Sequence, residues 1–405
     1  MLNIKRILYT QGELPLMTEQ IFFLTDNKIT KLQNGKIEYL TSQPLETYKR
    51  NIREIQKKNE WKTAGSGALF MRGETYYDDT DTDYAGRFGG LTKFKDNEIL
   101  YTLNIESNTG LHIKNILDEK EPESFIIRKN HMNIFTLDYQ TTTGRIAVCA
   151  SNESSAINLA IFNDKNTDYQ FITEGDCLDQ NPTWSKTHPD TVYYDSCGIA
   201  RDNSETFIGF GPRSVYKLNI NTGDLTEIIT DEKLDFIKPQ EDQEGNLYYL
   251  KKPYKSLYSK EPTSLKDIIM MPVKLAKAIF GWLNFFTQRY AGQSLKTSGS
   301  NPAKNKEKDP QELFVEGNLI NVLKEQKENE KQGEQYPGFA PKNWELIKKT
   351  IDGNETVIKT GLLDYHLCEN GDIIYSNGNY LIKLTNDGTE KMLTKTKMAT
   401  SIITI

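Results

Sequence analysis

The residues that most often carry out catalysis are scarce in this sequence. It has four histidines, His112, His131, His188 and His366, and histidine is the usual general base near neutral pH. None of them belongs to an HExxH motif, and the chain has no GxSxG and no GK[ST] motif. We therefore interpret the histidines as structural or exposed residues and assign no catalytic residue.

An acidic run, Asp78-Asp79-Thr-Asp81-Thr-Asp83, is the clearest candidate for a metal site. Asp79, Asp81 and Asp83 alternate along the chain, and carboxylates in a loop can supply part of the six to eight oxygens that Ca²⁺ takes. The run lacks the glycine and the terminal glutamate of an EF-hand loop. A solvated acidic loop is therefore the preferred interpretation, with no cofactor, and a Ca²⁺ site is the alternative.

Composition and charge restrict the class of protein. The net charge of −6 and the pI near 5.5 argue against a nucleic-acid binder. Met1 to Tyr9 shows no signal-peptide pattern, and no apolar run has the length of a membrane span. The four cysteines have no CxxC spacing, which favours reduced thiols. We expect a cytoplasmic protein.

The elements that must position any site recur as a repeat. Each copy has short apolar bursts rich in Tyr, Phe and Ile, separated by turns such as Asn-Gly and Asp-Gly. In the clearest copy the bursts occupy 182–185, 191–194, 214–218 and 225–230. The other copies cover 20–41, 91–127, 135–173, 236–250 with 344–358, and 364–394.

Uninterrupted copies recur about every 45 to 50 residues, which is the period of a propeller blade. Six copies predict an all-β, six-bladed β-propeller. The first copy has three bursts after Gln20, and Ser401-Ile-Ile-Thr-Ile405 can supply the fourth. We therefore predict that the C-terminal strand closes the ring. The alternative is a frayed β-rich tail.

The fourth copy resembles the TolB-like (WD-repeat-like) six-bladed propeller family. That repeat opens with Pro-x-Trp-Ser-Pro-Asp-Gly, and this chain has Pro182-Thr-Trp184-Ser185. Lys186-Thr-His188-Pro189-Asp190 departs from the Pro-Asp-Gly turn, and the other copies match in part. The resemblance implies the fold. Propellers of this kind serve many purposes, so it does not imply a function.

Two segments interrupt the repeat. The first covers about 43–90, where Leu45, Tyr48, Ile52 and Ile55 have helical spacing with a basic opposite face. The second covers 253–342 and interrupts blade five. The sequence is thus divided into 1–252 (blades one to five), 253–342 (insertion) and 343–405 (the rest of blade five, blade six and the closing strand).

The second insertion contains an amphipathic helix that we predict to begin at Pro272 and to reach Tyr290. A linker at 298–310 and a charged helix at 311–331 should follow it. The helix could cover its own propeller as a lid or plug, bind a partner protein, or lie in a membrane interface. Its candidate contact residues are Ile279, Phe280, Trp282, Leu283, Phe285 and Phe286.

Strand order places both insertions on one face of the propeller, because turns between second and third strands emerge on the same side as crossings between blades. The sequence therefore predicts a non-enzymatic protein-interaction platform that uses this face, with a membrane surface as a further target. The alternative is a metal-dependent hydrolase or lactonase in the central channel. Four carboxylates near the predicted inner strands could serve it: Asp138, Asp235, Glu241 and Asp364.

The acidic run gives a first prediction. Replacing Asp79 and Asp81 together by Asn should leave the melting temperature unchanged in Ca²⁺ and in chelator, because solvated carboxylates contribute little to stability. Thermal melts of both proteins under both conditions check this. A Ca²⁺-dependent rise in melting temperature that the double variant abolishes would show that the run binds the metal.

Overall fold

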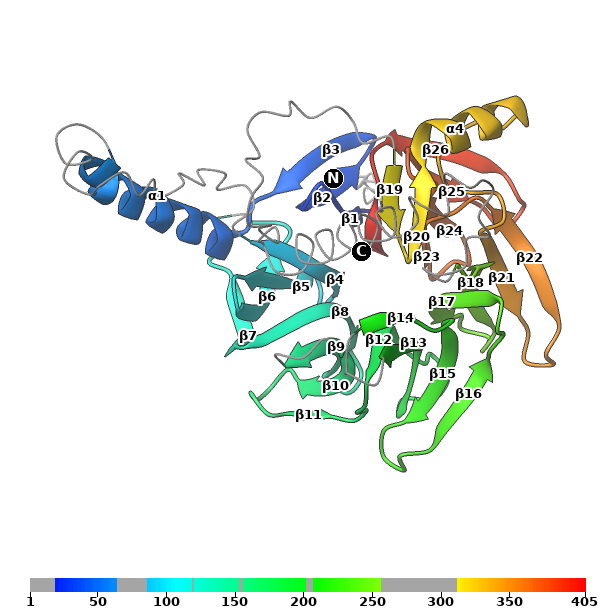
Figure 1. Cartoon of the computed structure of the whole chain (residues 1–405), viewed down its shortest axis with the longest axis horizontal. Coiled ribbons are helices and arrows are strands. Elements are labelled where there is room, and N and C mark those ends of the chain that lie inside the picture. Colours follow the sequence, from blue (N-terminus) through cyan, green and yellow to red (C-terminus); the bar gives the residue numbers. More distant parts are fainter. Residues whose placement is uncertain (1–18, 64–85, 119, 153–155, 202–206, 256–311) are drawn as a thin grey trace, which may run out of the picture.

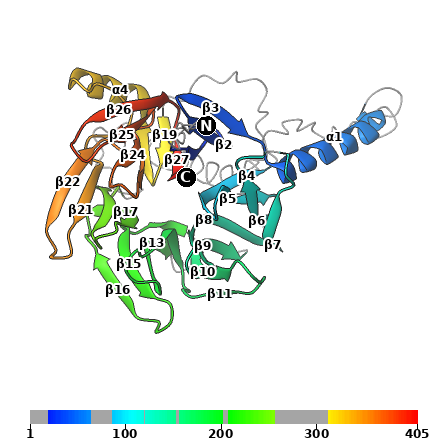
Figure 2. The ribbon, with the colours of Figure 1, turned by 180° about the vertical axis from the view of Figure 1, so that it is seen from behind.

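Six antiparallel sheets surround a central axis, and they form the predicted six-bladed β-propeller (Figures 1 and 2). The computed structural model describes residues 19–63, 86–118, 120–152, 156–201, 207–255 and 312–405. The predicted helix at 272–290, its six contact residues and the acidic run at 78–83 lie outside these ranges. Among the described helices, none is long and apolar enough to cross a membrane.

The strands of each blade follow one another from axis to rim. Blade one consists of β27 (Thr400–Thr404), β1 (Ile21–Thr25), β2 (Lys28–Gln33) and β3 (Lys36–Leu40). Blade two consists of β4 (Arg87–Lys93), β5 (Glu98–Ile105), β6 (Asn108–Asn115) and β7 (Ser124–Asn130). Blade three consists of β8 (Met132–Gln140), β9 (Arg145–Asn152), β10 (Asn158–Asn163) and β11 (Tyr169–Phe171).

Blades four to six continue the same order. Blade four consists of β12 (Cys177–Trp184), β13 (Thr191–Arg201), β15 (Ser214–Asn219) and β16 (Leu225–Ile229), with β14 (Phe207–Phe210) beside β13. Blade five consists of β17 (Leu234–Glu241), β18 (Leu247–Pro253), β21 (Glu345–Lys349) and β22 (Glu355–Thr360). Blade six consists of β23 (Asp364–Leu367), β24 (Ile373–Ser376), β25 (Tyr380–Leu384) and β26 (Glu390–Lys395).

The C-terminal strand closes the ring, as predicted. Strand β27 pairs antiparallel with β1 and forms the inner strand of blade one. Gln20 and Ile405 extend this pairing, because each backbone N–H donates to the other residue's carbonyl at 3.0 and 2.9 Å. Ile402 and Ile403 are buried. The two ends of the folded ring are therefore held in one sheet.

Apolar side chains fill the spaces between neighbouring blades. Phe22 and Ile403 of blade one, for example, belong to one buried cluster with Tyr101 of blade two. Each sheet thus buries both faces against its neighbours, since a four-stranded sheet alone would bury too little apolar surface to be stable.

The first insertion contains the predicted helix, α1 (Gln43–Thr63), which leaves the body of the propeller between β3 and β4 (Figure 1). Its first turn is anchored, because Leu45 is buried and the Tyr48 hydroxyl donates to Glu106 at 2.5 Å. The helix begins two residues before the predicted apolar series and runs beyond it.

The charged segment at 311–331 differs from the predicted helix. Its first half is a hairpin of β19 (Glu312–Val315) and β20 (Asn318–Asn321), and the helix α4 begins at Val322 and ends at Lys331. Glu316 and Gly317 form the two-residue turn with φ values of 45° and 81°, a conformation that favours hairpins. Asn321 caps α4 by accepting a hydrogen bond from the Lys324 backbone.

Ring closure gives the second prediction. Deleting residues 401–405 should lower the free energy of unfolding by several kcal/mol, because each of two buried isoleucines contributes about 1.5–3 kcal/mol and the pairing with β1 is lost. Urea unfolding measures the change. Met392→Ala, on the outer strand of blade six and 42% exposed, is the control and should change stability by about 0.5 kcal/mol or less. A truncated chain as stable as this control would refute closure.

Candidate functional site

The inner strands surround a cavity of about 700 Å³ along the propeller axis. Its lining includes the turns that follow the inner strands, marked by Lys186 and Asn370, so the cavity reaches this end of the propeller. We call this side the open face. The opposite side, where inner strands begin at Asp364 and Thr400, is the insertion face.

The β19–β20 hairpin lies at the insertion-face end of the cavity. Glu316, at its turn, is part of the cavity lining. Val315 and Ile320 are buried in one apolar cluster with Phe339 and Trp344. Hydrophobic packing thus fixes the hairpin to blades five and six, and it makes the axial cavity a pocket with a floor.

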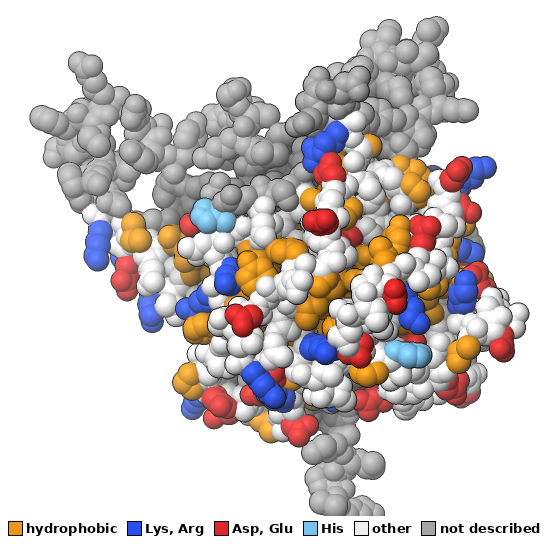
Figure 3. Space-filling view, turned by 90° about the horizontal axis from the view of Figure 1, so that it is seen from below, with side chains coloured by type: hydrophobic (Ala, Val, Ile, Leu, Met, Phe, Trp, Pro, Cys, Tyr) orange, Lys and Arg blue, Asp and Glu red, His pale blue; other side chains and the backbone are white. Residues whose placement is uncertain are grey.

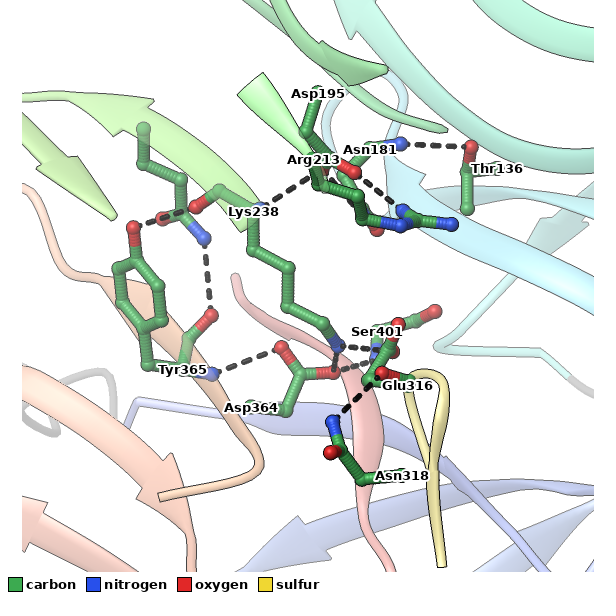
Figure 4. Close-up of polar contacts among 11 residues, drawn as sticks. Thr136, Asn181, Asp195, Arg213, Lys238, Glu316, Asn318, Asp364, Tyr365 and Ser401 are labelled. Atoms are coloured by element: carbon green, nitrogen blue, oxygen red, sulfur yellow. Dashed lines mark hydrogen bonds and ion pairs between the residues drawn. The ribbon is translucent and has the colours of Figure 1, made fainter. Parts of the chain in front are cut away.

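Lys238 holds this floor together. It occupies a bulge in β17, where the register with β18 shifts, and its φ is 57°. Its Nζ lies 3.0 Å from Asp364 Oδ2 and 3.4 Å from Glu316 Oε1 (Figure 4). One ammonium group therefore connects blade five, blade six and the inserted hairpin.

A second buried ion pair lies beside this floor. The carboxylate of Asp195 is fully buried and 2.5 Å from Arg213 Nη1. It also accepts hydrogen bonds from Asn181 Nδ2 at 2.7 Å and from the Lys238 backbone N–H at 2.9 Å. Burial opposes the charge of Arg213, but Asp195 and other carboxylates outweigh it and raise the arginine's pKa. Asp195 thus joins blades four and five while Arg213 stays charged.

Bulges recur on the inner strands, and side chains of the preceding blade bind their backbone. Asn181 donates its N–H to Thr136 Oγ1 at 3.1 Å, and Ser401 donates to Asp364 Oδ2 at 3.0 Å (Figure 4). Asp364 Oδ1 also accepts from the Tyr365 N–H at 2.8 Å. Buried backbone donors are satisfied in this way, and Asp364 ties blade six to the closing strand.

The four carboxylates considered for a channel metal serve as similar acceptors. Asp138 accepts from the Trp184 N–H at 2.8 Å, and Asp235 lies 2.5 Å from Lys252 Nζ. Glu241 accepts from the Ser185 hydroxyl at 2.5 Å. Within the described ranges no three or more acidic, histidine or cysteine side chains converge in a way that could hold a metal. Asp138, Glu241 and Asp364 line the axial cavity and Asp235 does not, so the structure does not gather the four carboxylates into a site.

The histidines occupy different surroundings. His366 lines the cavity with Nε2 3.2 Å from Thr404 Oγ1, and burial, with Lys186 and Lys93 nearby, lowers its pKa to about 4. Burial, aided by Arg128, also lowers the pKa of His112 to about 4. His188 contacts the Thr187 hydroxyl at 2.8 Å, and that hydroxyl also contacts Glu241.

Sequence reasoning missed the residues that form the floor, although two local signals point to them. Lys238 and Asn181 each precede a proline within an inner strand, and proline inside a strand marks a bulge or an edge. Glu316-Gly317 separates two short apolar stretches, which is a hairpin signal. Neither signal indicates which charges meet at the axis.

Among known proteins, only solved structures resemble this chain. No protein-family model matches the sequence, and no curated protein does. TolB from Acinetobacter baumannii is 7% identical with a TM-score of 0.49, over 96% of this chain and 66% of that chain. The tricorn protease is 11% identical with a TM-score of 0.46, over 95% of this chain and 34% of that chain. A putative TolB from Agrobacterium tumefaciens is 10% identical with a TM-score of 0.43, over 94% of this chain and 90% of that chain. The fold assignment rests on the strand pairing itself.

The shared lysine gives the third prediction. Asp364→Asn should lower the free energy of unfolding by about 3 kcal/mol, because it removes a buried charge from Lys238 and weakens the acceptor of two backbone N–H groups. Glu316→Gln should cost about 1 kcal/mol or less, because Lys238 keeps Asp364. Chemical denaturation of the two variants compares them. Equal losses would show that Glu316 is as important to the fold as Asp364.

Proposed function

We propose that this protein is a non-enzymatic protein-interaction platform whose partner binds the insertion face. The observation that carries the proposal is α1, a helix anchored at its base and exposed along most of its described length. It leaves the same face of the propeller as the second insertion.

Strand direction supports a common face for both insertions. Neighbouring strands in every blade are antiparallel, so α1 follows an outer strand and precedes the start of the inner strand β4. The chain also leaves blade five after its second strand, β18, and returns at its third, β21. Both excursions therefore emerge where inner strands begin.

The base of α1 is held rigidly. The Gln43 backbone N–H donates to Glu123 Oε1 at 3.2 Å, and the Glu123 N–H donates to Gln43 Oε1 at 3.1 Å. Tyr101 donates its hydroxyl hydrogen to the other oxygen of Glu123, and Lys114 forms a buried ion pair with Glu123 at 2.9 Å. Blade two thus fixes the direction in which the helix leaves the body.

Beyond its base α1 presents a basic surface. Arg50, Arg53 and Lys57 are exposed and share one side of the helix by their spacing. Ile55, on the other side, is 52% exposed. The helix has six basic and three acidic residues in a chain of net charge −6. These features suit a partner with an acidic surface.

The rim offers a contrast to α1. On the side seen in Figure 3, acidic and basic side chains lie interspersed, with apolar ones between them. Mixed charges of this kind solvate a surface and do not select a partner by charge. The projecting helix is therefore the better candidate for specific recognition.

The proposal extends to the second insertion, where Ile279, Phe280, Trp282, Leu283, Phe285 and Phe286 would add an apolar contact with the partner. It places the protein in the cytoplasm, with a membrane surface as the alternative target of the same face. A metal-dependent hydrolase or lactonase would need Asp138, Asp235 and Glu241 to release their present partners.

A photo-crosslinking residue tests the face and is the fourth prediction. Placed at Ile55, it should give a crosslinked protein adduct in cells, because this side chain would lie in the interface. The matched control is Leu225, which is 54% exposed on the outer strand of blade four. Crosslinking to lipid instead of protein would indicate that the insertion face binds a membrane surface. Equal protein adducts at both positions, or none at Ile55, would contradict the proposal.

A further inference from the structure

We propose that α1 pairs with an amphipathic helix of the partner protein, and that this helix carries acidic residues on both sides of its apolar seam. The inference rests on the proposed function, because it names the kind of segment that binds the helix leaving the insertion face. Its structural basis is an apolar stripe on α1 that begins in contact with the propeller and continues beyond it.

The apolar residues of this stripe recur at intervals of three and four residues. Leu45, Tyr48, Ile52 and Ile55 lie at i, i+3, i+7 and i+10. This is the a and d pattern of a helix that packs against another helix along a narrow seam. A helix that covers a core has further apolar positions beside these two. The stripe of α1 is therefore patterned for pairing with one helix.

The propeller covers only the first part of the seam. Leu45 is buried in the apolar cluster shared by blades one and two, and the hydroxyl of Tyr48 is hydrogen-bonded to blade two. Ile52 is partly exposed and Ile55 is 52% exposed. From Ile52 the helix continues to Thr63, about 17 Å at 1.5 Å per residue, and it points away from the body (Figure 2). About three turns of α1 can therefore contact a partner helix.

Basic side chains flank the seam and define the charge of the partner. By helical spacing Lys49, which also lies 3.8 Å from Glu46, is on one side of the seam, and the exposed Lys58 is on the other. Lysines at such flanking positions pair with glutamates of the facing helix. A second copy of α1 does not supply them, because each copy has six basic and three acidic residues and two copies would repel each other.

The rigid base of α1 favours this pairing. An isolated helix of about 15 residues or fewer is marginal in water, so ordering it on binding would cost free energy. α1 is already formed, and Gln43 and Glu123 fix its first turn. Its short seam can therefore contribute its binding free energy with little loss to ordering. A helix lying in a membrane interface presents a wide apolar face, so the narrow seam favours a protein helix over lipid.

Two designed peptides test the charge of the partner helix. Both have leucine at the a and d positions over about three heptads; one has glutamate at e and g, and the other has lysine there. The like charges within each peptide oppose its pairing with itself. In fluorescence anisotropy titrations with the full chain, the glutamate peptide should bind saturably and about tenfold or more tightly than the lysine peptide.

Single substitutions test whether the seam is the contact. Ile55→Ser should weaken binding of the glutamate peptide about tenfold or more, because an apolar side chain is lost from the interface. Leu225→Ser, on the outer strand of blade four, is the matched control and should leave affinity unchanged. Lys58→Glu should weaken binding of the glutamate peptide and strengthen binding of the lysine peptide. Lys57→Glu makes the same charge change on the opposite side of the helix and should do neither at about 0.15 M salt, where screening is strong beyond about 8 Å.

The inference and the proposed function can fail separately. Equal affinities for the two peptides, no saturable binding of the glutamate peptide up to about 1 mM, or equal effects of Lys57→Glu and Lys58→Glu would overturn the inference. A protein adduct at Ile55 in cells together with any of these results would leave the proposed function in place. Selective binding of the glutamate peptide without an adduct at Ile55 would support the seam as a helix-binding site and contradict the proposed function.

Discussion

The pairing of β27 with β1 is the interaction on which the rest of the structure depends. Six sheets arranged in an open series would leave two blades with an uncovered apolar face. Closure covers these faces, because Ile403 of the last strand enters the same buried cluster as Phe22 and Tyr101. Asp364 reinforces the junction by binding the Ser401 N–H. Each blade then shares a buried apolar cluster with the blade on either side.

Polar and charged side chains lie along the axis of the closed ring. Most of the charged groups there bind neighbouring blades to one another. Inner strands bulge where they converge, which frees backbone N–H groups that must find acceptors. Carboxylates of neighbouring blades provide several of them, as Asp195 does for Lys238. An acid used in this way has lost most of its capacity to bind a metal or to move a proton.

Much of the fold could be predicted because it is repeated. The number of blades, the order of strands and the closing strand all follow from short apolar bursts at a regular spacing. The second half of the 311–331 segment is helical as predicted, but the first half was predicted wrongly, because its charged residues favour a helix locally. Its hairpin is stabilised by contacts distant in sequence, where Val315 and Ile320 meet Phe339 and Trp344. The ion pair of Asp195 and Arg213 likewise depends on the pairing of two strands in a sheet. No local sequence pattern predicts that these two residues meet.

The hairpin also determines how the two faces relate to each other. Lys238 contacts Glu316, and both residues line the cavity. Two buried aliphatic side chains, Val315 and Ile320, contribute about 1.5–3 kcal/mol each to keeping the hairpin in place. The Glu316 contact contributes much less, because Asp364 already compensates Lys238 at the shorter distance. Loss of that ion pair would therefore leave the hairpin in place.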